Sequence, residues 1–538
     1  MNESSLLTWI VFMPTIGAVL LLFLSGSELL KRTTLLFTVV TFGLSLLLIK
    51  PFVGGGVGAE GAGYGTIFFE QIVPWIHSGA FKVDYHLGVD GLSMPLVILT
   101  TLITALAAWA SWSFESWHTK RGLKGYLVLL LLLETGMLGV FVALDFFLFY
   151  IFWEVMLLPM YFLIGVWGGP RKEYAAIKFF IYTLAGSVLM LVAMLAFYFY
   201  QPVGGDRTFD LIKLANDTTI QEIFRNPATT FLGFKFSTIM FVLLFIGFAI
   251  KVPIFPFHTW LPDAHVEAPT PISMILAGVL LKMGGYGLFR ICYPILPDAA
   301  VYLAVFLGAL GVVNIIYGAL CAMAQDDFKK LVAYSSISHM GYVLLGMAAL
   351  TVAGFQGAMF QMIAHGISSP MCFFLVGVIY ERAHHREINR FGGLWLSMPK
   401  YGSMATLGFF ASLGLPALCG FIGEVFVVYG TFDSAVLRDA GNYNMLFGVL
   451  AALGAIFTAA YILWLIQRVY LGKEKPEYAG FRDATARELA ILAPMAVLAI
   501  VLGVLPKQAL LEYVTGTLNN ILNPILALSH HALAFAGG

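Results

Sequence analysis

Long apolar runs dominate this sequence and constrain its fold more than any other feature. A helix needs about 20 mostly apolar residues to cross a bilayer, and about 14 stretches meet that need. They span 6–24, 34–49, 92–112, 126–143, 145–167, 175–200, 236–256, 271–292, 300–323, 331–349, 352–379, 402–432, 444–470 and 486–505. The runs are continuous rather than short and alternating, which favours helices over a membrane β-barrel. The sequence therefore predicts an all-α integral membrane protein.

The charge content excludes other classes of protein. Only 11% of the 538 residues are charged, with 30 basic and 30 acidic residues, against about 25% in ordinary soluble domains. Such a chain cannot cover a soluble globular surface, and it has no basic excess with which to bind nucleic acid. The lipid bilayer is its expected environment.

Basic residues predict the orientation in the membrane. With 14 spans, 18 Lys and Arg residues fall in the loops on one side and 9 in the loops and tails on the other. The richer side is expected to be cytoplasmic, which places both termini outside a bacterial inner membrane. The first run lacks a basic start and a small-residue cleavage site, so we expect a retained helix rather than a signal peptide.

Two parts of the chain look alike at an offset of about 181 residues. The stretch 145–165 aligns with 326–346, and the helices that follow keep nearly the same offset. Three successive segments in register suggest a duplicated unit of five helices. An odd number of spans per unit would place the two copies in opposite orientations, an arrangement common in transporters.

Each copy also carries a proline inside an apolar run, Pro253 in KVPIFPF and Pro416 in GLPALCG. Proline cannot donate a backbone hydrogen bond, so it frees the carbonyls of Ala249 and Ser412. Broken helices in membranes tend to line hydrated cavities. A simple packing kink is an equal alternative for either helix alone, but a similar break in both copies favours a functional role for helices 7 and 12.

Ionisable residues inside the spans are the main functional candidates, because each costs at least ~2.5–3.5 kcal/mol to insert. The set comprises Glu134, Glu154, Lys251, Lys282, His339, His365 and Glu424. A Glu that moves relative to a Lys changes the proton affinity of the Lys, and histidine can relay protons near neutral pH. Static ion pairing is the alternative for any single member, and a satisfied core histidine is the more common role for a residue such as His365. Glu134 could simply bond a neighbouring helix.

Several motifs resemble the antiporter-like membrane subunits of respiratory complex I, and the resemblance covers nearly the whole chain. They are FWEVMLLPMYFLIG around Glu154, KVPIFPFHTWLPDAHVEAPTPIS from Lys251 to Ser273, GVLLKMGGYGLFR around Lys282, YSSISHMGYV around His339, and GLPALCGFIGE ending at Glu424. The second motif is highly specific for this superfamily. Many paralogues have Lys at the position of Glu424. A Glu at this position resembles the M-type subunits of bacterial NADH–quinone oxidoreductase.

The resemblance implies a division of the chain and roles for its buried charges. Residues 1–125 would hold helices 1–3 and an outer loop, 126–292 the first inverted repeat (helices 4–8), 300–470 the second (helices 9–13), and 471–538 the last helix and an amphipathic segment. Glu154 and Lys251 would form a coupling pair, Lys282 and His339 a central relay, and Glu424 the route outward. His365 and Glu134 fit this scheme more weakly, and Asp263, His258 and His265 match a family loop without an assigned role.

The family also implies partners. FMN, iron–sulfur clusters, NADH and quinone would belong to other subunits, so no redox active site, cofactor or metal site is expected in this chain. Its neighbours would be L-type and N-type antiporter-like subunits of the membrane arm. The four cysteines lie singly in apolar stretches, without metal-binding spacing.

Three other interpretations stay open from the sequence. A subunit of a multisubunit cation/proton antiporter or of an energy-converting hydrogenase would share most of these motifs. A purely structural membrane-arm subunit would have the helices without an ion path, and a stand-alone solute carrier would need a central substrate cavity. Finally, apolar residues recur at helical spacing between Leu510 and Ile525, which predicts an amphipathic helix rather than a further span.

Overall fold

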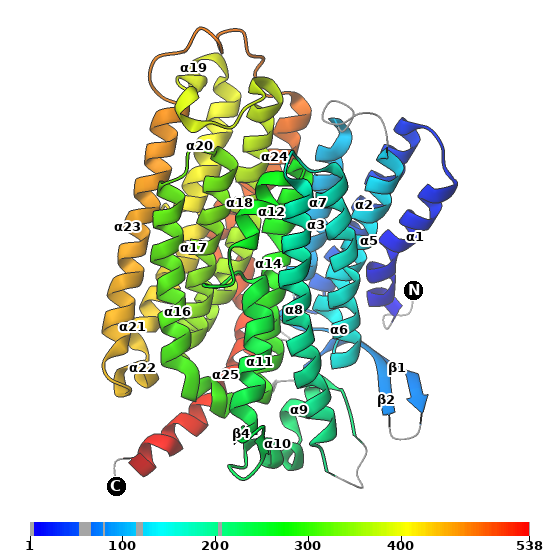
Figure 1. The fold of residues 1–538 in the computed structure, drawn as a ribbon, viewed down its shortest axis with the longest axis vertical. Helices are drawn as coiled ribbons and strands as arrows, with labels where there is room; N and C mark the ends of the chain where they lie inside the picture. Colours follow the sequence, from blue (N-terminus) through cyan, green and yellow to red (C-terminus); the bar gives the residue numbers. More distant parts are fainter. Residues whose placement is uncertain (1–4, 53–65, 79–80, 114–121, 203–206, 537–538) are drawn as a thin grey trace.

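Helices make up nearly the whole of the chain, and most run along one common direction (Figure 1). The computed structural model describes residues 5–52, 66–78, 81–113, 122–202 and 207–536. Lys120 and Arg121, two of the basic residues in the orientation count, lie outside these ranges. Within them, 12 helices are long and apolar enough to cross a membrane.

The 12 candidate spans agree closely with the predicted apolar runs. Nine consist mainly of one helix: α1 (Leu6–Phe23), α2 (Ser27–Leu46), α3 (Ser93–Ala110), α5 (Leu123–Val142), α8 (Lys172–Phe199), α16 (Pro297–Met323), α17 (Phe328–Ala348), α18 (Val352–Ala383) and α23 (Tyr443–Val469). The tenth candidate span is also a single helix, α24 (Ala486–Val504). Another is α6 (Phe146–Val155) followed by α7 (Leu157–Trp167). The last joins α13 (Thr270–Ile275), α14 (Leu281–Gly287) and α15 (Tyr293–Ile295) through π-helical turns at Leu276–Leu280 and Leu288–Cys292.

The two remaining predicted spans are broken at their prolines. Helix α11 (Phe236–Lys251) ends just before Pro253, and α12 (Trp260–Glu267) follows it; α20 (Pro399–Leu413) and α21 (Cys419–Asp433) flank Pro416. The carbonyl expected to be freed at Ala249 instead accepts from the backbone N–H of Ile254 at 2.7 Å. No water or side chain is needed there, contrary to the sequence-based expectation.

A side chain from a neighbouring helix braces the first break. Asn314 of α16 is fully buried. Its Oδ1 accepts from the N–H of Phe255 at 2.7 Å, and its Nδ2 donates to the carbonyl of Pro253 at 3.1 Å. Because backbone groups inside a membrane must be satisfied within the protein, this one amide stabilises the non-helical segment between α11 and α12.

One end of the bundle carries most of the extra secondary structure. It holds the antiparallel hairpin β1 (Phe68–Ser78) and β2 (Phe81–Val89), the helices α9 (Leu211–Asn216), α10 (Thr218–Arg225) and α22 (Ala435–Asp439), and the small hairpin β3 (Thr230–Phe231) and β4 (Phe234–Lys235) (Figure 1). The start of α1 and the end of the last helix, α25 (Glu512–Ala536), also lie towards this end. The β1–β2 hairpin falls where the sequence predicted an outer loop.

His86 joins the β1–β2 hairpin to the bundle. Its Nε2 lies 2.9 Å from Glu70 Oε1, and its Nδ1 lies 3.5 Å from Asp210 Oδ2. Burial alone lowers the pKa of His86, but the two carboxylates outweigh it and raise the pKa above its ordinary value. The His86 side chain therefore holds the hairpin to the bundle most strongly when it is protonated.

The amphipathic segment predicted near the C-terminus is helix α25 and the turn before it. Its apolar side chains Leu510, Val514, Leu518, Ile521, Leu522 and Ile525 are almost fully buried. The helix packs against α15, α16 and α18, and Gln356 Nε2 of α18 donates to Thr515 Oγ1 at 2.9 Å. It begins within the bundle and extends beyond it (Figure 1).

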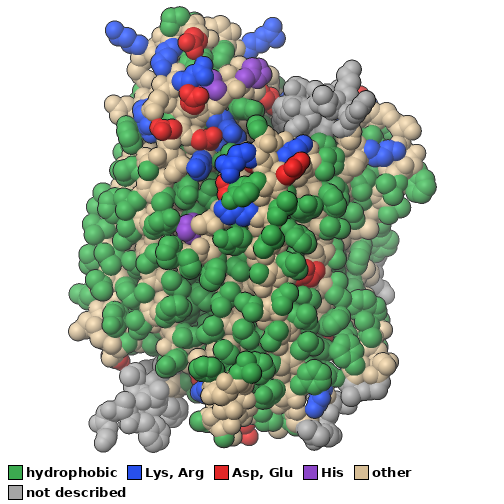
Figure 2. All heavy atoms as spheres, in the orientation of Figure 1, with side chains coloured by type: hydrophobic (Ala, Val, Ile, Leu, Met, Phe, Trp, Pro, Cys, Tyr) green, Lys and Arg blue, Asp and Glu red, His purple; other side chains and the backbone are tan. Residues whose placement is uncertain are grey.

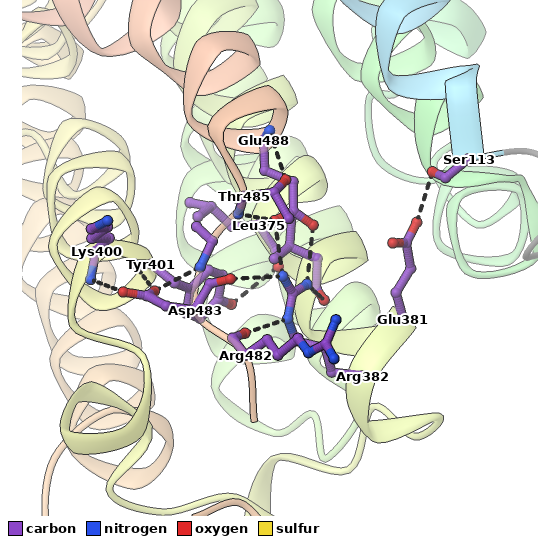
Figure 3. A network of polar contacts seen from close by, with 12 residues as sticks. Ser113, Leu375, Glu381, Arg382, Lys400, Tyr401, Arg482, Asp483, Thr485 and Glu488 are labelled. Carbon is purple, nitrogen blue, oxygen red and sulfur yellow. Dashed lines mark hydrogen bonds and ion pairs between the residues drawn. The ribbon is translucent and has the colours of Figure 1, made fainter. Parts of the chain in front are cut away.

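At the opposite end lies α19 (Leu394–Ser397), and a polar network there ties three helices together (Figure 3). Arg382 of α18 makes a two-pronged ion pair with Glu488 of α24, at 3.0 and 2.9 Å. The Asp483 carboxylate accepts from the backbone N–H groups of Lys400 and Tyr401 at 3.0 Å each, and so caps α20 from a distant segment.

The surface fits a membrane setting. A broad belt of hydrophobic side chains covers the middle of the face shown, while charged side chains gather mainly towards the α19 end (Figure 2). Large apolar side chains are well exposed on several helices, including Leu22, Ile181 and Ile456. In water such a belt would be unfavourable, but against lipid tails it is the expected surface.

The two halves of the chain each contain an isolated backbone bridge at a corresponding position. Asp145 bridges to Asp210 beside the β1–β2 hairpin, and Asp327 bridges to Glu387 at the α19 end. Each first-named Asp also caps the helix that follows it, α6 or α17. These positions differ by 182 residues, one more than the offset in the sequence alignment, and lie at opposite ends of the bundle.

Candidate functional site

A chain of buried polar side chains crosses the centre of the bundle, starting at Lys282. This residue follows the π-helical turn Leu276–Leu280 and has no exposed surface. Its Nζ donates to the carbonyl of Ala277 and lies 2.6 Å from His365 Nδ1 of α18. Single π-helical turns inside α-helices are frequent at functional sites. Here the turn brings a backbone oxygen to the lysine head group.

The chain continues through two histidines to a glutamate. The ring of His365 lies 5.7 Å from that of His339 on α17, centroid to centroid. His339 Nδ1 lies 3.2 Å from Glu424 Oε1 of α21. Four helices thus bring Lys282, His365, His339 and Glu424 together, each no more than 5% exposed. His365, the weaker candidate from the sequence, occupies the link between the lysine and the second histidine.

The break in helix 12 positions the glutamate. Gly414 ends α20 with φ +81°, a conformation that side chains other than glycine rarely adopt. A Cβ built there would come within 3.0 Å of Glu424 Oε2. Because α21 restarts at Cys419, Glu424 lies near the beginning of the new helix and beside the turn. The proline pattern predicted this break, but only the fold shows that the carboxylate packs against it.

Two neutral polar side chains complete the surroundings of His339. Ser412 Oγ of α20 lies 3.2 Å from His339 Nε2, and Gln361 Nε2 of α18 lies 3.4 Å from Nδ1. Sequence analysis named Ser412 only for its backbone carbonyl and did not name Gln361, although a polar side chain inside a predicted span was the available signal. Both ring nitrogens of His339 consequently have polar neighbours, so the ring can exchange a proton on either side.

Glu154 and Lys251, the expected coupling pair, do not form an ion pair in this structure. Lys251 is 1% exposed, and its Nζ lies 3.7 Å from Met156 Sδ and 5.2 Å from the centre of the Trp153 ring. Glu154 acts on Lys251 electrostatically, but within the described residues no ion pair joins the two. Lys251 instead lies among the sulfur and ring faces of its neighbours.

A joint in the fifth span follows Glu154 closely. Helix α6 ends at Val155 and α7 begins at Leu157. Pro159, the third residue of α7, has no N–H to donate to the carbonyl of Val155. The glutamate therefore lies one residue before the end of α6, beside a break in its span, with its side chain only partly covered.

The other candidate residues are placed as follows. Glu134 of α5 has no exposed surface, and neither carboxyl oxygen has a hydrogen-bond partner among the described residues. The bond to a neighbouring helix, its structural alternative, is not seen there. Asp263 pairs with Lys178 at 2.7 Å, and His258 stacks on Phe255 at 5.7 Å between ring centres.

Comparison with known proteins shows the family. Residues 143–458 match the model described as NADH:quinone oxidoreductase/Mrp antiporter, and residues 65–139 match the amino terminus of NADH-ubiquinone oxidoreductase chain 4. The chain is 42% identical over 516 residues to NADH-quinone oxidoreductase subunit M of Rhodobacter capsulatus, covering 94% of each protein. It belongs to the subunit M family of NADH-quinone oxidoreductase.

Solved structures agree with membership of the subunit M family. A chain of respiratory complex I from Thermus thermophilus with bound NADH superposes with a TM-score of 0.79 at 28% identity, covering 96% of this chain and 99% of that one. A chain of the Mrp complex from Dietzia sp. DQ12-45-1b has the same TM-score at 19% identity and covers 97% and 98%. The second likeness shows a shared fold. The chain is thus a multi-pass membrane subunit of NADH-quinone oxidoreductase.

Proposed function

We propose that this subunit moves protons across the membrane through Lys282, His365, His339 and Glu424, driven by redox chemistry in other subunits. The observation that carries the proposal is a buried line of ionisable groups, in which Lys282 contacts His365, His339 contacts Glu424, and the two imidazole rings are neighbours. Buried ionisable groups are costly in a membrane, and so many in one line make a poor means of stabilising helices.

Each contact suggests a step. Lys282 Nζ faces His365 Nδ1 at hydrogen-bond distance, so a proton can pass between them directly. Among the described residues no hydrogen bond joins the two imidazole rings, whose centres are 5.7 Å apart. Transfer between the rings would therefore use a ring rotation or a bridging water. His339 then passes the proton to Glu424, whose carboxylate lies beside the break in helix 12. An imidazole suits this role because it can accept at one nitrogen and release from the other.

Lys251 and Glu154 are proposed as the coupling element. Their separation leaves room for a shift of Glu154 towards or away from Lys251, and the joint between α6 and α7 provides a place for it to move. Such a shift changes how strongly Lys251 holds its proton, and this change would be passed to Lys282. Glu134, which is buried and has no hydrogen-bond partner among the described residues, is proposed as a further charge-responsive group.

The setting follows from the family and the charge distribution. We propose a bacterial inner membrane, the α19 end in the cytoplasm and both termini outside, because basic loops favour the cytoplasmic side. L-type and N-type antiporter-like subunits would be the neighbours, and FMN, iron–sulfur clusters, NADH and quinone would be held by other subunits. The matching bridges at Asp145 and Asp327 support inverted repeats over 126–292 and 300–470.

The test uses the assembled complex in sealed membrane vesicles. Protons pumped per electron are measured together with quinone reduction in Lys282→Met, Glu154→Ala and Lys251→Ala. Lys400→Met, at the exposed start of α20, is the control for loss of a lysine outside the proposed path. We expect the first three to pump fewer protons per electron at normal assembly. Normal pumping in all three would refute the proposal and favour a structural subunit without an ion path.

A further inference from the structure

Another buried lysine, outside the line of groups described above, lies between Lys282 and the α19 end. Lys329, at the start of α17, is 5% exposed, although it belongs to the basic residues counted in a loop from the sequence. Its Nζ donates to the carbonyl of Ala268, the residue immediately after α12. Burying a lysine in this way costs free energy because its head group loses its hydration. The burial of Lys329 therefore suggests a function.

Acidic groups lie on the outer side of Lys329. Asp327 is 30% exposed and its Oδ2 lies 3.2 Å from Arg386 Nε. Glu267, the last residue of α12, accepts from the N–H of Arg171 at 2.9 Å. Both carboxylates act electrostatically on Lys329. Lys329 is thus two residues from Asp327, which is partly open to water, and it bonds to the carbonyl of the residue that follows Glu267.

His265 lies on the inner side of Lys329. It is fully buried, and neither ring nitrogen has a hydrogen-bond partner in the part of the chain that the structure describes. The ring stacks on Phe373 of α18 at 4.2 Å between ring centres. It is within electrostatic reach of both Lys329 and Lys282. A buried imidazole whose nitrogens have no hydrogen bond costs free energy, and among the described residues only His258 is in the same situation.

We propose that Lys329 and His265 form the proton uptake route from the α19 end to Lys282. A proton taken from water by Asp327 or Glu267 passes to neutral Lys329, then to His265, and on to Lys282. Each transfer moves one proton from a donor to a lone pair and needs no other reactant. The unpaired nitrogens of His265 are then explained, because a relay group must have one nitrogen able to accept and one able to release.

A structural role is the competing explanation for each residue. A cation at the C-terminal end of α12 would stabilise the last carbonyls of that helix, and a ring at position 265 would pack on Phe373. Conservative variants separate the two roles. Lys329→Arg keeps a cation at the helix end but cannot give up its proton under physiological conditions. His265→Phe keeps an aromatic ring for stacking and removes both nitrogens.

The inference rests on the proposed function, so Lys282→Met is measured alongside. In vesicles of the assembled complex, we expect Lys329→Arg and His265→Phe to lose the same fraction of protons pumped per electron as Lys282→Met. Acidifying the cytoplasmic side should partly restore pumping in these two variants, because a higher proton concentration compensates for the missing step between the α19 end and Lys282. Lys330→Met, the adjacent and partly exposed lysine, should pump normally and serves as the control.

The other possible outcomes distinguish failure of the uptake route from failure of the proposed function. Normal pumping in both conservative variants, with reduced pumping in Lys282→Met, would overturn the uptake route and leave the proposed function standing. The same holds if Lys329→Met is defective while Lys329→Arg is normal, since a structural cation would suffice. Normal pumping in Lys282→Met would instead refute the proposed function itself.

Discussion

The buried ion pair between Arg290 and Asp90 offers a quantitative test of how the bundle is held together. Arg290 Nη2 lies 2.6 Å from Asp90 Oδ1, and the two side chains are 1% and 5% exposed. The same oxygen accepts from the N–H groups of Leu92 and Ser93 at 3.1 Å each, at the start of α3. The pair thus joins α3 to the π-helical turn before α15.

The expected cost follows from this burial. In Arg290→Met the Asp90 carboxylate loses its counter-charge in a place closed to water, which costs about 3–5 kcal/mol. Adding Asp90→Asn removes the stranded charge, while Asn remains as good a helix cap as Asp. The double variant should therefore be less destabilised than Arg290→Met alone, even though it has lost the same contact.

Cys292 makes the change measurable, because it is buried and lies two residues beyond Arg290. In a chain that keeps only this cysteine, the rate of thiol labelling reports local opening. A loss of about 3–5 kcal/mol corresponds to labelling faster by about a hundredfold or more, since 1.4 kcal/mol is tenfold. Arg438→Met removes an exposed cation, 56% accessible, from the same end of the bundle and should leave the rate unchanged. Labelling no faster in Arg290→Met, or faster still in the double variant, would refute the reasoning.

Three further predictions concern stability outside the proton path. The raised pKa of His86 means that its stabilisation is complete below the unfolded value of about 6.5 and is lost as pH rises through the folded pKa. Hydrogen exchange in the β1–β2 hairpin should therefore quicken with pH beyond the intrinsic increase, and His86→Gln should abolish the excess. Asn314→Leu leaves two backbone groups of the broken helix unpaired, at about 1–3 kcal/mol each. Its thermal unfolding temperature in detergent should fall, whereas an unchanged value would mean that the break needs no brace. Arg382→Met strands the Glu488 carboxylate, and protease cleavage near the α19 end should increase while the hairpin end stays resistant.

The spans were predictable because their signal is local. Lipid demands about 20 apolar residues in each helix, so the predicted run 6–24 coincides almost completely with α1 and 444–470 with α23. Pro253 and Pro416 gave a local signal for the breaks because proline removes a backbone donor, but Pro14, Pro370 and Pro494 lie inside unbroken helices. The β1–β2 hairpin was missed because its exposed strand lacks a regular alternation of buried and exposed residues.

The functional residues were predictable only as a list. Charge inside an apolar run marked Lys282, His339 and Glu424, but nothing local indicates that Lys282 touches His365 or that Lys329 lies inside the protein rather than in a loop. Those relations join helices far apart in the sequence, and they depend on how the helices pack. The sequence alone determined which segments are apolar enough to enter the membrane and which of them carry charge. The tertiary structure decided which charges meet, because burial and distance between side chains are set by helix packing.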